Sequence, residues 1–530
     1  MKNILITALI LFTCLACNVN ELDFSDLEKP KLQQTVAIPL GTISYTMREL
    51  IDKIGDTSLD LQEDSTSLIQ LNYYDTASFD SGEDIIFIDD VLNSESIYVD
   101  ATPASSESQV IQVLDNFTFN YPSEDNKQVD SVFYKAGQMT LTVSSYLSQD
   151  ISYDIAIQNT RRVSNDTPVQ FSGNLAGNSS ASSSIDLSGH KTFLAFSETE
   201  GNTFSLDADI SIFLNPGESI AQNDSIAITL VYEDQEFEIL YGKFGQDRIN
   251  VGNETLDVKF FSDLGESGLR FGSPEINFYF SSSFGLPMGV LFDGMYAVDS
   301  AVSGNDTIYL QGDATVDPQV VDAAASPGQF VASVVTLNPE NSSLRELLGV
   351  SPNTIGFSLT ALTNPEDASA SNFVMDTSRI STNIEMKLPL ELSLDNLTRE
   401  IDFDLGDGLS FDETDSVSIR VVTENEFPFS AQLGLQILNE NDSILHEVAS
   451  NLIVEIPFLN LQGIVTQSRK QVSDVPLNKD GIEALKVGKK LNLILTLNTP
   501  KGNRDVFVKV LADYKIDIKV SAVGKLNIEL

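Results

Sequence analysis

The stretch Tyr514-Lys-Ile-Asp-Ile-Lys-Val520 decides the fold class, because apolar and charged side chains alternate along it at every step. In an extended chain, successive side chains point to opposite sides, so the apolar residues share one side and the charged residues the other. This period of two predicts a strand with one face on a core and the other in water, as in antiparallel sheets.

The same alternation recurs along the chain, at 69–73, 139–143, 276–280, 388–394 and 491–497. Asn-Asp pairs at 223–224, 305–306 and 441–442 suit the turns before strands, and the last pair predicts a hairpin between 431–438 and the residues from Ser443 on. Pro389 predicts an edge strand, since proline has no N–H to donate. We therefore expect an all-β fold of multiple antiparallel β-sandwich domains.

A few short capping helices complete the predicted fold. Thr46 and Glu49 form one capping-box pattern and Ser343 and Glu346 a second, each just before or within an apolar run. A third short helix is expected near 481–487. In contrast, the Ser/Gly/Asn-rich stretch from Gly173 to Ser188 is typical of a loop.

The charge balance restricts the partners of the chain. The 530 residues include 31 Lys and Arg against 77 Asp and Glu, a formal net charge of −46. Such a chain repels phosphate backbones, so we expect no nucleic-acid partner. Apolar residues make up 42 %, which is enough for packed cores rather than wholesale disorder.

The N-terminus predicts export and lipidation. A positively charged start precedes the apolar run Ile4–Leu15, which is the length of a signal-peptide core and too short to span a bilayer. Thr13-Cys14-Leu15-Ala16-Cys17 resembles a bacterial lipobox, in which the cysteine after a small residue receives the lipid. The resemblance implies a signal peptide at 1–16 and Cys17 as the lipidated residue, with a tether over 17–35. We expect the membrane as one partner, through this lipid anchor at the outer membrane, with the facing side left open.

The body is expected to contain a β-sandwich region at 36–250, with a seam near 120 between two sub-domains. Further sandwich domains are expected at 251–380 and 381–530. Three longer patterns, Asn341–Leu348 with Pro352 and Asn364-Pro365, Pro274–Pro287, and Asn425–Pro428, resemble large β-rich exported lipoproteins of the Bacteroidota. The resemblance implies an exported all-β family and brings no catalytic residues with it.

Catalytic and metal motifs are sparse. His190 and His446 are the two histidines, and neither has a motif around it, so we expect no histidine triad, no zinc site and no enzyme. Calcium is the better inorganic candidate, since Asp402, Asp404, Asp407 and Asp412 gather around glycines and hard cations take oxygen ligands. A solvent-facing strand edge explains the same spacing, and no other cofactor is expected.

Asp followed by Ser or Thr and an aliphatic residue recurs along the chain and is similar to the O-glycosylation motif of exported Bacteroidota proteins. The hydroxyl residues concerned are Thr76, Ser131, Ser225, Thr307, Ser416 and Ser443. A turn entering a strand explains the same tripeptide.

Three functions remain open at this level. The first is a non-catalytic cell-envelope lipoprotein with a binding or structural role. The second is a lipoprotein that holds an apolar ligand or a glycan in an interior cleft. The third is a hydrolase with paired carboxylates. The protein or glycan partner is not specified by the sequence.

The lipid anchor generates the first testable prediction. Cys17→Ser removes the sulfur that carries the acyl chains, and several chains are needed for stable anchoring. We expect the variant to move from the membrane to the soluble fraction, measured by immunoblotting of fractionated cells. Equal membrane association of both proteins would contradict the anchor.

Overall fold

The structure is a computed structural model, and it describes residues 31–52, 60–80, 86, 88–123, 125, 127–258, 268–298, 307–405, 414–500 and 506–529. Strands dominate this part of the chain and pair antiparallel, so the predicted all-β fold class is confirmed. The chain divides into two compact units, Met1–Ile51 with Asp395–Leu530, and Asp52–Leu394.

The first unit contains two four-stranded sheets, with strand orders β1-β35-β27-β32 and β26-β33-β28-β29. The strands of the first sheet are β1 (Lys31–Thr46), β35 (Lys515–Glu529), β27 (Thr414–Asn425) and β32 (Arg469–Pro476). Those of the second are β26 (Leu397–Asp404), β33 (Lys490–Asn498), β28 (Ser430–Leu438) and β29 (Ile444–Val454). The short strands β30 (Phe458–Leu459), β31 (Val465–Gln467) and β34 (Val508–Lys509) complete it.

The alternation quoted at the outset places the core of this unit. Ile516, Ile518 and Val520 of β35 are 6 %, 0 % and 1 % exposed. β35 pairs with β1 on one side and with β27 on the other, so the sheet joins strands from distant parts of the sequence. The predicted hairpin is confirmed, because β28 pairs with β29.

Two helices border this unit. In α2 (Met47–Asp52), the Glu49 N–H donates to Thr46 Oγ1 at 3.2 Å and the Thr46 N–H donates to Glu49 Oε2 at 2.8 Å. This reciprocal pair confirms the first capping box. α4 (Lys479–Val487) begins two residues before the predicted start, since Asn478 accepts a hydrogen bond from the Gly481 N–H and forms its N-cap.

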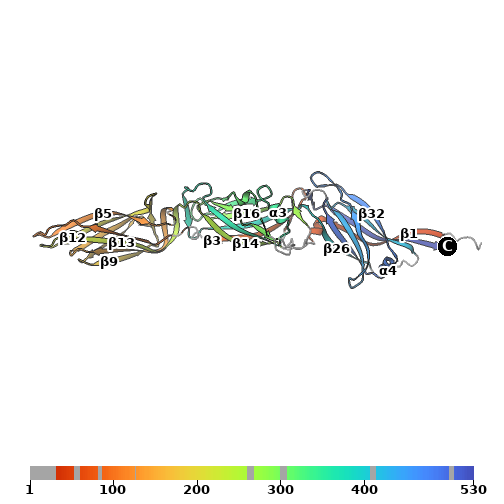
Figure 1. The fold of residues 1–530 in the computed structure, drawn as a ribbon, viewed down its shortest axis with the longest axis horizontal. Coiled ribbons are helices and arrows are strands. Elements are labelled where there is room, and N and C mark those ends of the chain that lie inside the picture. Colours follow the sequence, from red (N-terminus) through yellow and green to blue (C-terminus); the bar gives the residue numbers. More distant parts are fainter. Residues whose placement is uncertain are drawn as a thin grey trace, which may run out of the picture. The chain divides into compact units, whose positions relative to one another are not determined.

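The second unit contains a sandwich built from two strand groups, β5-β12-β7-β8 and β4-β13-β6-β9. Figure 1 shows β5, β12, β13 and β9 running alongside one another. The first group comprises β5 (Gln109–Tyr121), β12 (Gly201–Leu214), β7 (Asp150–Arg162) and β8 (Pro168–Leu175). The second comprises β4 (Val91–Tyr98), β13 (Ser225–Lys243), β6 (Gln128–Ser145) and β9 (Ser180–Asp186). β10 (His190–Phe193) pairs with both β6 and β7 and so links the groups, while β11 (Ala195–Ser197) pairs with β12.

The rest of this unit forms further sheets. One has the order β2-β3-β24-β16-β21, with β2 (Asp60–Glu63), β3 (Ile69–Asp80), β24 (Arg379–Pro389), β16 (Glu275–Ser282) and β21 (Val331–Leu337). Another is built around β22 (Thr354–Thr363), with β14 (Arg248–Asp257), β17 (Met288–Leu291), β18 (Tyr296–Val298), β19 (Thr307–Tyr309) and β20 (Gln319–Val321). β15 (Arg270–Phe271) pairs with β25 (Glu391–Ser393), and β23 (Asn372–Met375) pairs with β13.

Three local predictions are wrong. Gly173–Ser188 is not a loop, because its serines form β9 against β6, where Thr140 and Thr142 meet Ser184 and Ser182 at 2.9 and 2.7 Å. The helix α3 (Leu344–Leu348) exists, but no side chain caps it, since the Ser343 hydroxyl accepts the Gln311 N–H instead. β24 lies between β3 and β16 rather than at an edge. Its Pro389 is tolerated because pairing with β16 already ends at Lys387.

The predicted domain bounds stay a prediction. Strands that fall in different predicted domains nevertheless pair with each other. β1 begins in the predicted tether and continues into the predicted 36–250 region, whereas β35, with which it pairs, falls in the predicted 381–530 domain. β3 and β24, at opposite ends of the second unit in sequence, are likewise neighbours in one sheet.

A buried hydrogen-bonded network ties the sandwich together. Tyr134 donates to Thr192 Oγ1 at 2.9 Å, Thr192 lies 2.9 Å from Thr160 Oγ1, and Thr160 lies 2.8 Å from the Tyr232 hydroxyl. All four residues are at most 1 % exposed. They come from β6, β10, β7 and β13, so the network joins both strand groups. A buried hydroxyl that loses its partner costs about 1–3 kcal/mol, so we infer that the network fixes the pairing of these strands.

The network predicts a difference between two otherwise similar threonines. Thr160→Val leaves the Tyr232 hydroxyl without that partner and should lower the free energy of unfolding by about 1–3 kcal/mol. Thr142→Val is the matched control, because Thr142 also bonds a hydroxyl neighbour but lies on the outer face, where changes stay within about 0.5 kcal/mol. Urea unfolding followed by near-ultraviolet circular dichroism measures both, and equal effects would contradict the role of the network.

The network also predicts alkaline sensitivity. Burial raises the pKa of Tyr134 to about 12, and burial likewise raises the pKa values of Tyr121 and Tyr232. A tyrosine titrates near 10 in the unfolded chain, so the stabilisation is complete below about pH 10 and is lost as the pH rises towards the folded value. We expect the urea midpoint to fall above about pH 10, less steeply in Tyr134→Phe. Ionisation of these tyrosines without unfolding would contradict this.

Candidate functional site

The outward side of β3, β24, β16 and β21 carries the most distinctive exposed side chains in the described residues. Cross-strand pairing places the outward residues of these strands in two neighbouring rows, Tyr74-Glu385-Asn277-Thr336 and Thr76-Asn383-Tyr279-Val334, of which Asn277 is only 5 % exposed. We call these eight residues the tyrosine face. The opposite side of the same strands is buried, as Ile384, Met386 and Phe278 show, so the sheet holds the tyrosine face rigidly.

Two tyrosine rings stand out on this face. The Tyr74 side chain is 52 % exposed and Tyr279 is 38 % exposed. Between and beside them lies a shallow depression of about 570 Å³, lined by Tyr74, Asp75, Thr76, Tyr279, Asn383, Ile384 and Glu385. Aromatic side chains with one polar end suit recognition surfaces, because they offer apolar area together with a hydrogen-bonding hydroxyl.

The polar groups of the tyrosine face are held in place by one another. The Tyr279 hydroxyl donates to Glu385 Oε2 at 2.6 Å, and Lys387 Nζ lies 3.1 Å from the same oxygen. Next to them, Thr336 Oγ1 donates to Asn277 Oδ1 at 2.7 Å. Because each bond joins neighbouring strands or positions two apart on one strand, the side chains are oriented before any ligand arrives.

These contacts shift the pKa values of Glu385 and Tyr279. Partial burial opposes ionisation of Glu385, but hydrogen bonds from Tyr279 and Lys387 and the charge of Lys387 outweigh it, so its pKa lies below the usual value. The hydrogen bond to Glu385 raises the pKa of Tyr279. At neutral pH the face therefore presents a carboxylate and a protonated tyrosine, which together can accept and donate hydrogen bonds.

A second depression, of about 600 Å³, lies on the outer side of β5, β12, β7 and β8. Asp209 stands directly opposite Asp154 in the strand pairing, and Asp207 is two residues away on the same face. Amide groups meet these carboxylates, with Asn116 and Gln158 donating to Asp207 and Gln170 to Asp154. Within the described residues, no group of three or more His, Cys, Asp or Glu residues is arranged to hold a metal ion.

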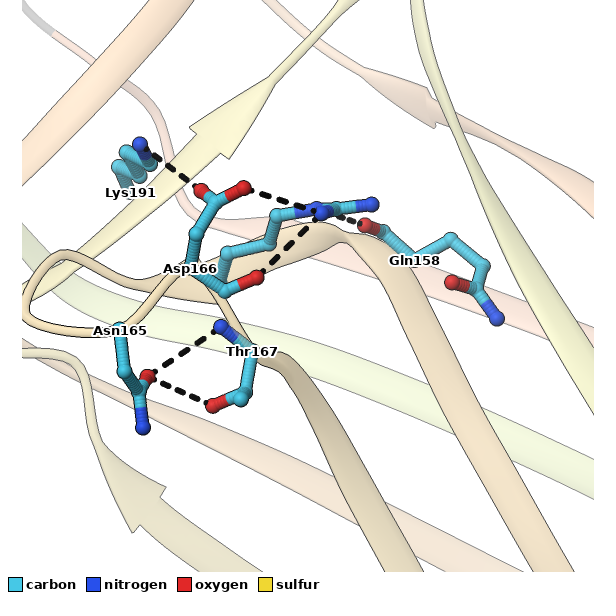
Figure 2. A network of polar contacts seen from close by, with 6 residues as sticks. Gln158, Asn165, Asp166, Thr167 and Lys191 are labelled. Atoms are coloured by element: carbon cyan, nitrogen blue, oxygen red, sulfur yellow. Dashed lines mark hydrogen bonds and ion pairs between the residues drawn. The ribbon is translucent and has the colours of Figure 1, made fainter.

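The turn between β7 and β8 carries a polar network (Figure 2). Asp166 lies 3.0 Å from Lys191 Nζ and 3.2 Å from Arg161 Nη1, and the Arg161 Nε donates to the Gln158 carbonyl at 2.9 Å. The hydrogen bond from Lys191, with the charges of Lys191 and Arg161, holds the pKa of Asp166 below its usual value. Asn165 accepts from Thr167 and closes the turn, so this network stabilises a hairpin.

The predicted calcium ligands are only partly described. Asp402 and Asp404 are exposed on β26, opposite Asn492 and Lys490, while Asp407 and Asp412 lie outside the described residues. The ammonium of Lys490 also pairs with Asp442, at 2.5 Å. A lysine beside these aspartates matches the solvent-facing strand edge that we considered as the alternative, and the calcium site stays a prediction.

The hydroxyl residues of the repeated tripeptide fall in different environments. Thr76, Thr307, Ser416 and Ser443 are exposed, Ser225 is half-buried, and Ser131 is 7 % exposed. A sugar on Ser131 would have to displace the neighbouring strands, whereas the exposed positions could carry one. Their glycosylation stays a prediction, as does lipidation of Cys17, which lies outside the described residues.

Neither histidine is part of the tyrosine face. His190 is buried in β10, with Nδ1 3.2 Å from the Ser188 carbonyl oxygen. His446 is half-buried in β29, where its ring packs beside Gly481 at the start of α4, and an added Cβ there would lie 2.8 Å from Nε2. Both positions fit packing roles.

Sequence reasoning missed the tyrosine face. The alternation at 276–280 placed Tyr279 and Asn277 on the solvent side of a strand, but nothing in the sequence paired them with Tyr74 or Glu385. An exposed tyrosine between buried phenylalanines was the one available signal.

No helix in the described part of the chain is long and apolar enough to cross a membrane. No family model matches the chain, and no curated protein matches it. Among solved structures, a protein of Parabacteroides distasonis described as secreted is 15 % identical, with 55 % of this chain and 90 % of that chain covered and a TM-score of 0.33. PNGase F, a glycosylasparaginase from Flavobacterium meningosepticum, is 10 % identical, with 56 % and 96 % covered and a TM-score of 0.14. Likenesses at this level carry no argument about function.

Proposed function

We propose that the protein is a non-catalytic cell-envelope lipoprotein, anchored at the outer membrane through Cys17, that binds an envelope component with the tyrosine face. The observation that carries the proposal is the arrangement of Tyr74, Tyr279 and Glu385, two exposed rings around an oriented carboxylate on a rigid sheet. Rigid sheets that present oriented groups suit binding, since little side-chain freedom is lost on contact.

The interior-cleft and hydrolase alternatives have less support. An exposed aromatic pair favours recognition at a surface over an apolar ligand held inside. A general acid needs a carboxyl group whose pKa is raised, whereas the pKa of Glu385, the carboxyl group of this face, is lowered by its partners.

Binding to isolated envelopes tests the proposal. The full chain with Cys17→Ser, purified without acyl chains, should sediment with envelope fragments of cells that lack the protein. Replacing both Tyr74 and Tyr279 by Ala should weaken this binding about tenfold or more, because central aromatic residues dominate most binding surfaces.

The matched control replaces two exposed tyrosines away from the tyrosine face. Tyr98 in β4 is 73 % exposed and Tyr146, just after β6, is 61 % exposed. The variant with both Tyr98→Ala and Tyr146→Ala should bind the envelopes as strongly as the chain that keeps all four tyrosines. Equal loss in both double variants, or no sedimentation of any protein, would contradict the proposal.

A further inference from the structure

Resting on this proposed function, we infer that the tyrosine face takes an uncharged glycan chain with pairs of neighbouring hydroxyls. The inference depends on one juxtaposition, in which Tyr74 and Tyr279 flank Asn383 and Glu385 on adjoining rows of the sheet. Each part of this arrangement matches a different part of a sugar.

The rings match the apolar faces of sugars. Tyr74 and Tyr279 lie two strands and two residues apart, which is about 10 Å across the strands and about 7 Å along them. Two rings at this separation can each cover the C–H face of a sugar in the same short oligosaccharide. A small ligand could contact only one ring, so the spacing favours a chain.

The groups between the rings match hydroxyls. Asn383 is exposed and offers an amide donor and acceptor, and Glu385 offers carboxylate oxygens that are already oriented by Tyr279 and Lys387. Amides and carboxylates carry two neighbouring polar atoms in a plane, and two adjacent hydroxyls of a sugar can meet both. The tyrosine face therefore has partners for both the apolar and the polar sides of a sugar ring.

Charge selects among glycans. Two carboxyl groups, Asp75 and Glu385, line the depression, the ammonium of Lys387 pairs with only one of them, and the chain as a whole carries a net charge of −46. An anionic glycan would be repelled by this surface, whereas an uncharged one would not. The depression is also open and partly polar rather than a dry apolar pocket, which is a poor match for the buried anchors of a tight protein partner.

Periodate treatment of the envelopes tests the inference, because periodate cleaves neighbouring hydroxyls of sugars. The Cys17→Ser chain is sedimented with untreated, periodate-treated and proteinase-treated envelopes. Loss of binding after periodate, at least tenfold, is expected. Binding that persists after periodate treatment would overturn the inference that the ligand is a glycan. If proteinase treatment then abolishes that binding, the proposed function stands with a protein as the partner. Absence of binding to untreated envelopes overturns the proposed function and the inference together.

Two variants of one residue separate ring contact from hydroxyl contact. Tyr279→Phe keeps the ring and loses the hydrogen bond to Glu385, so binding should fall less than threefold. Tyr279→Ala loses the ring, and binding should fall about tenfold. Circular dichroism of both variants confirms folding. Equal losses in the two variants, or binding that weakens steeply with added salt, would contradict an uncharged glycan stacked on the ring.

Discussion

One-sided burial of antiparallel strands is the constraint on which the rest of the structure depends. In β24, Ile380, Ile384 and Met386 are at most 5 % exposed, while Asn383 and Glu385 between them point outward. A register shift of one residue would exchange these faces, burying a carboxylate and exposing the core, so the pairing with β3 and β16 is strongly specified. The same alternation that builds the core therefore determines which side chains a ligand can reach.

Much of the fold could be predicted because this constraint is local. The alternation at 276–280 and 491–497 predicts strands that the structure contains as β16 and β33. The failures have local causes too. The serines of β9 were predicted to form a loop, because small polar residues also suit turns. In the structure their hydroxyls form hydrogen bonds with the threonines of β6. Ser343 was predicted to cap a helix, but its hydroxyl accepts a hydrogen bond from the N–H of Gln311, two residues beyond β19.

The candidate site could not be predicted, because it is built from pairings that span most of the second unit in sequence. Tyr74 lies opposite Glu385, more than three hundred residues along the chain, and Tyr279 joins from a strand between them. The alternation of apolar and polar residues indicates which residues face solvent, but it does not predict which strands pair with each other. Asp402 and Asp404 show the converse, since their closeness in sequence to other aspartates suggested a calcium site, whereas the structure places them on the exposed edge strand β26; the calcium site stays a prediction.

The covalent order of the two units bears on how such a protein could work. β1, the first described strand, begins at Lys31 within the predicted tether and pairs with β35, so the first unit holds both strands. The second unit, which carries the tyrosine face, lies between Ile51 and Asp395 in the sequence. In the function that we propose, anchoring and recognition are separate properties: acyl chains on Cys17 would hold the protein at the membrane, and the tyrosine face would select the ligand. If the predicted tether raises the local concentration near the envelope, weak contacts of the rings with sugar faces and of the polar groups with sugar hydroxyls would suffice for lasting association.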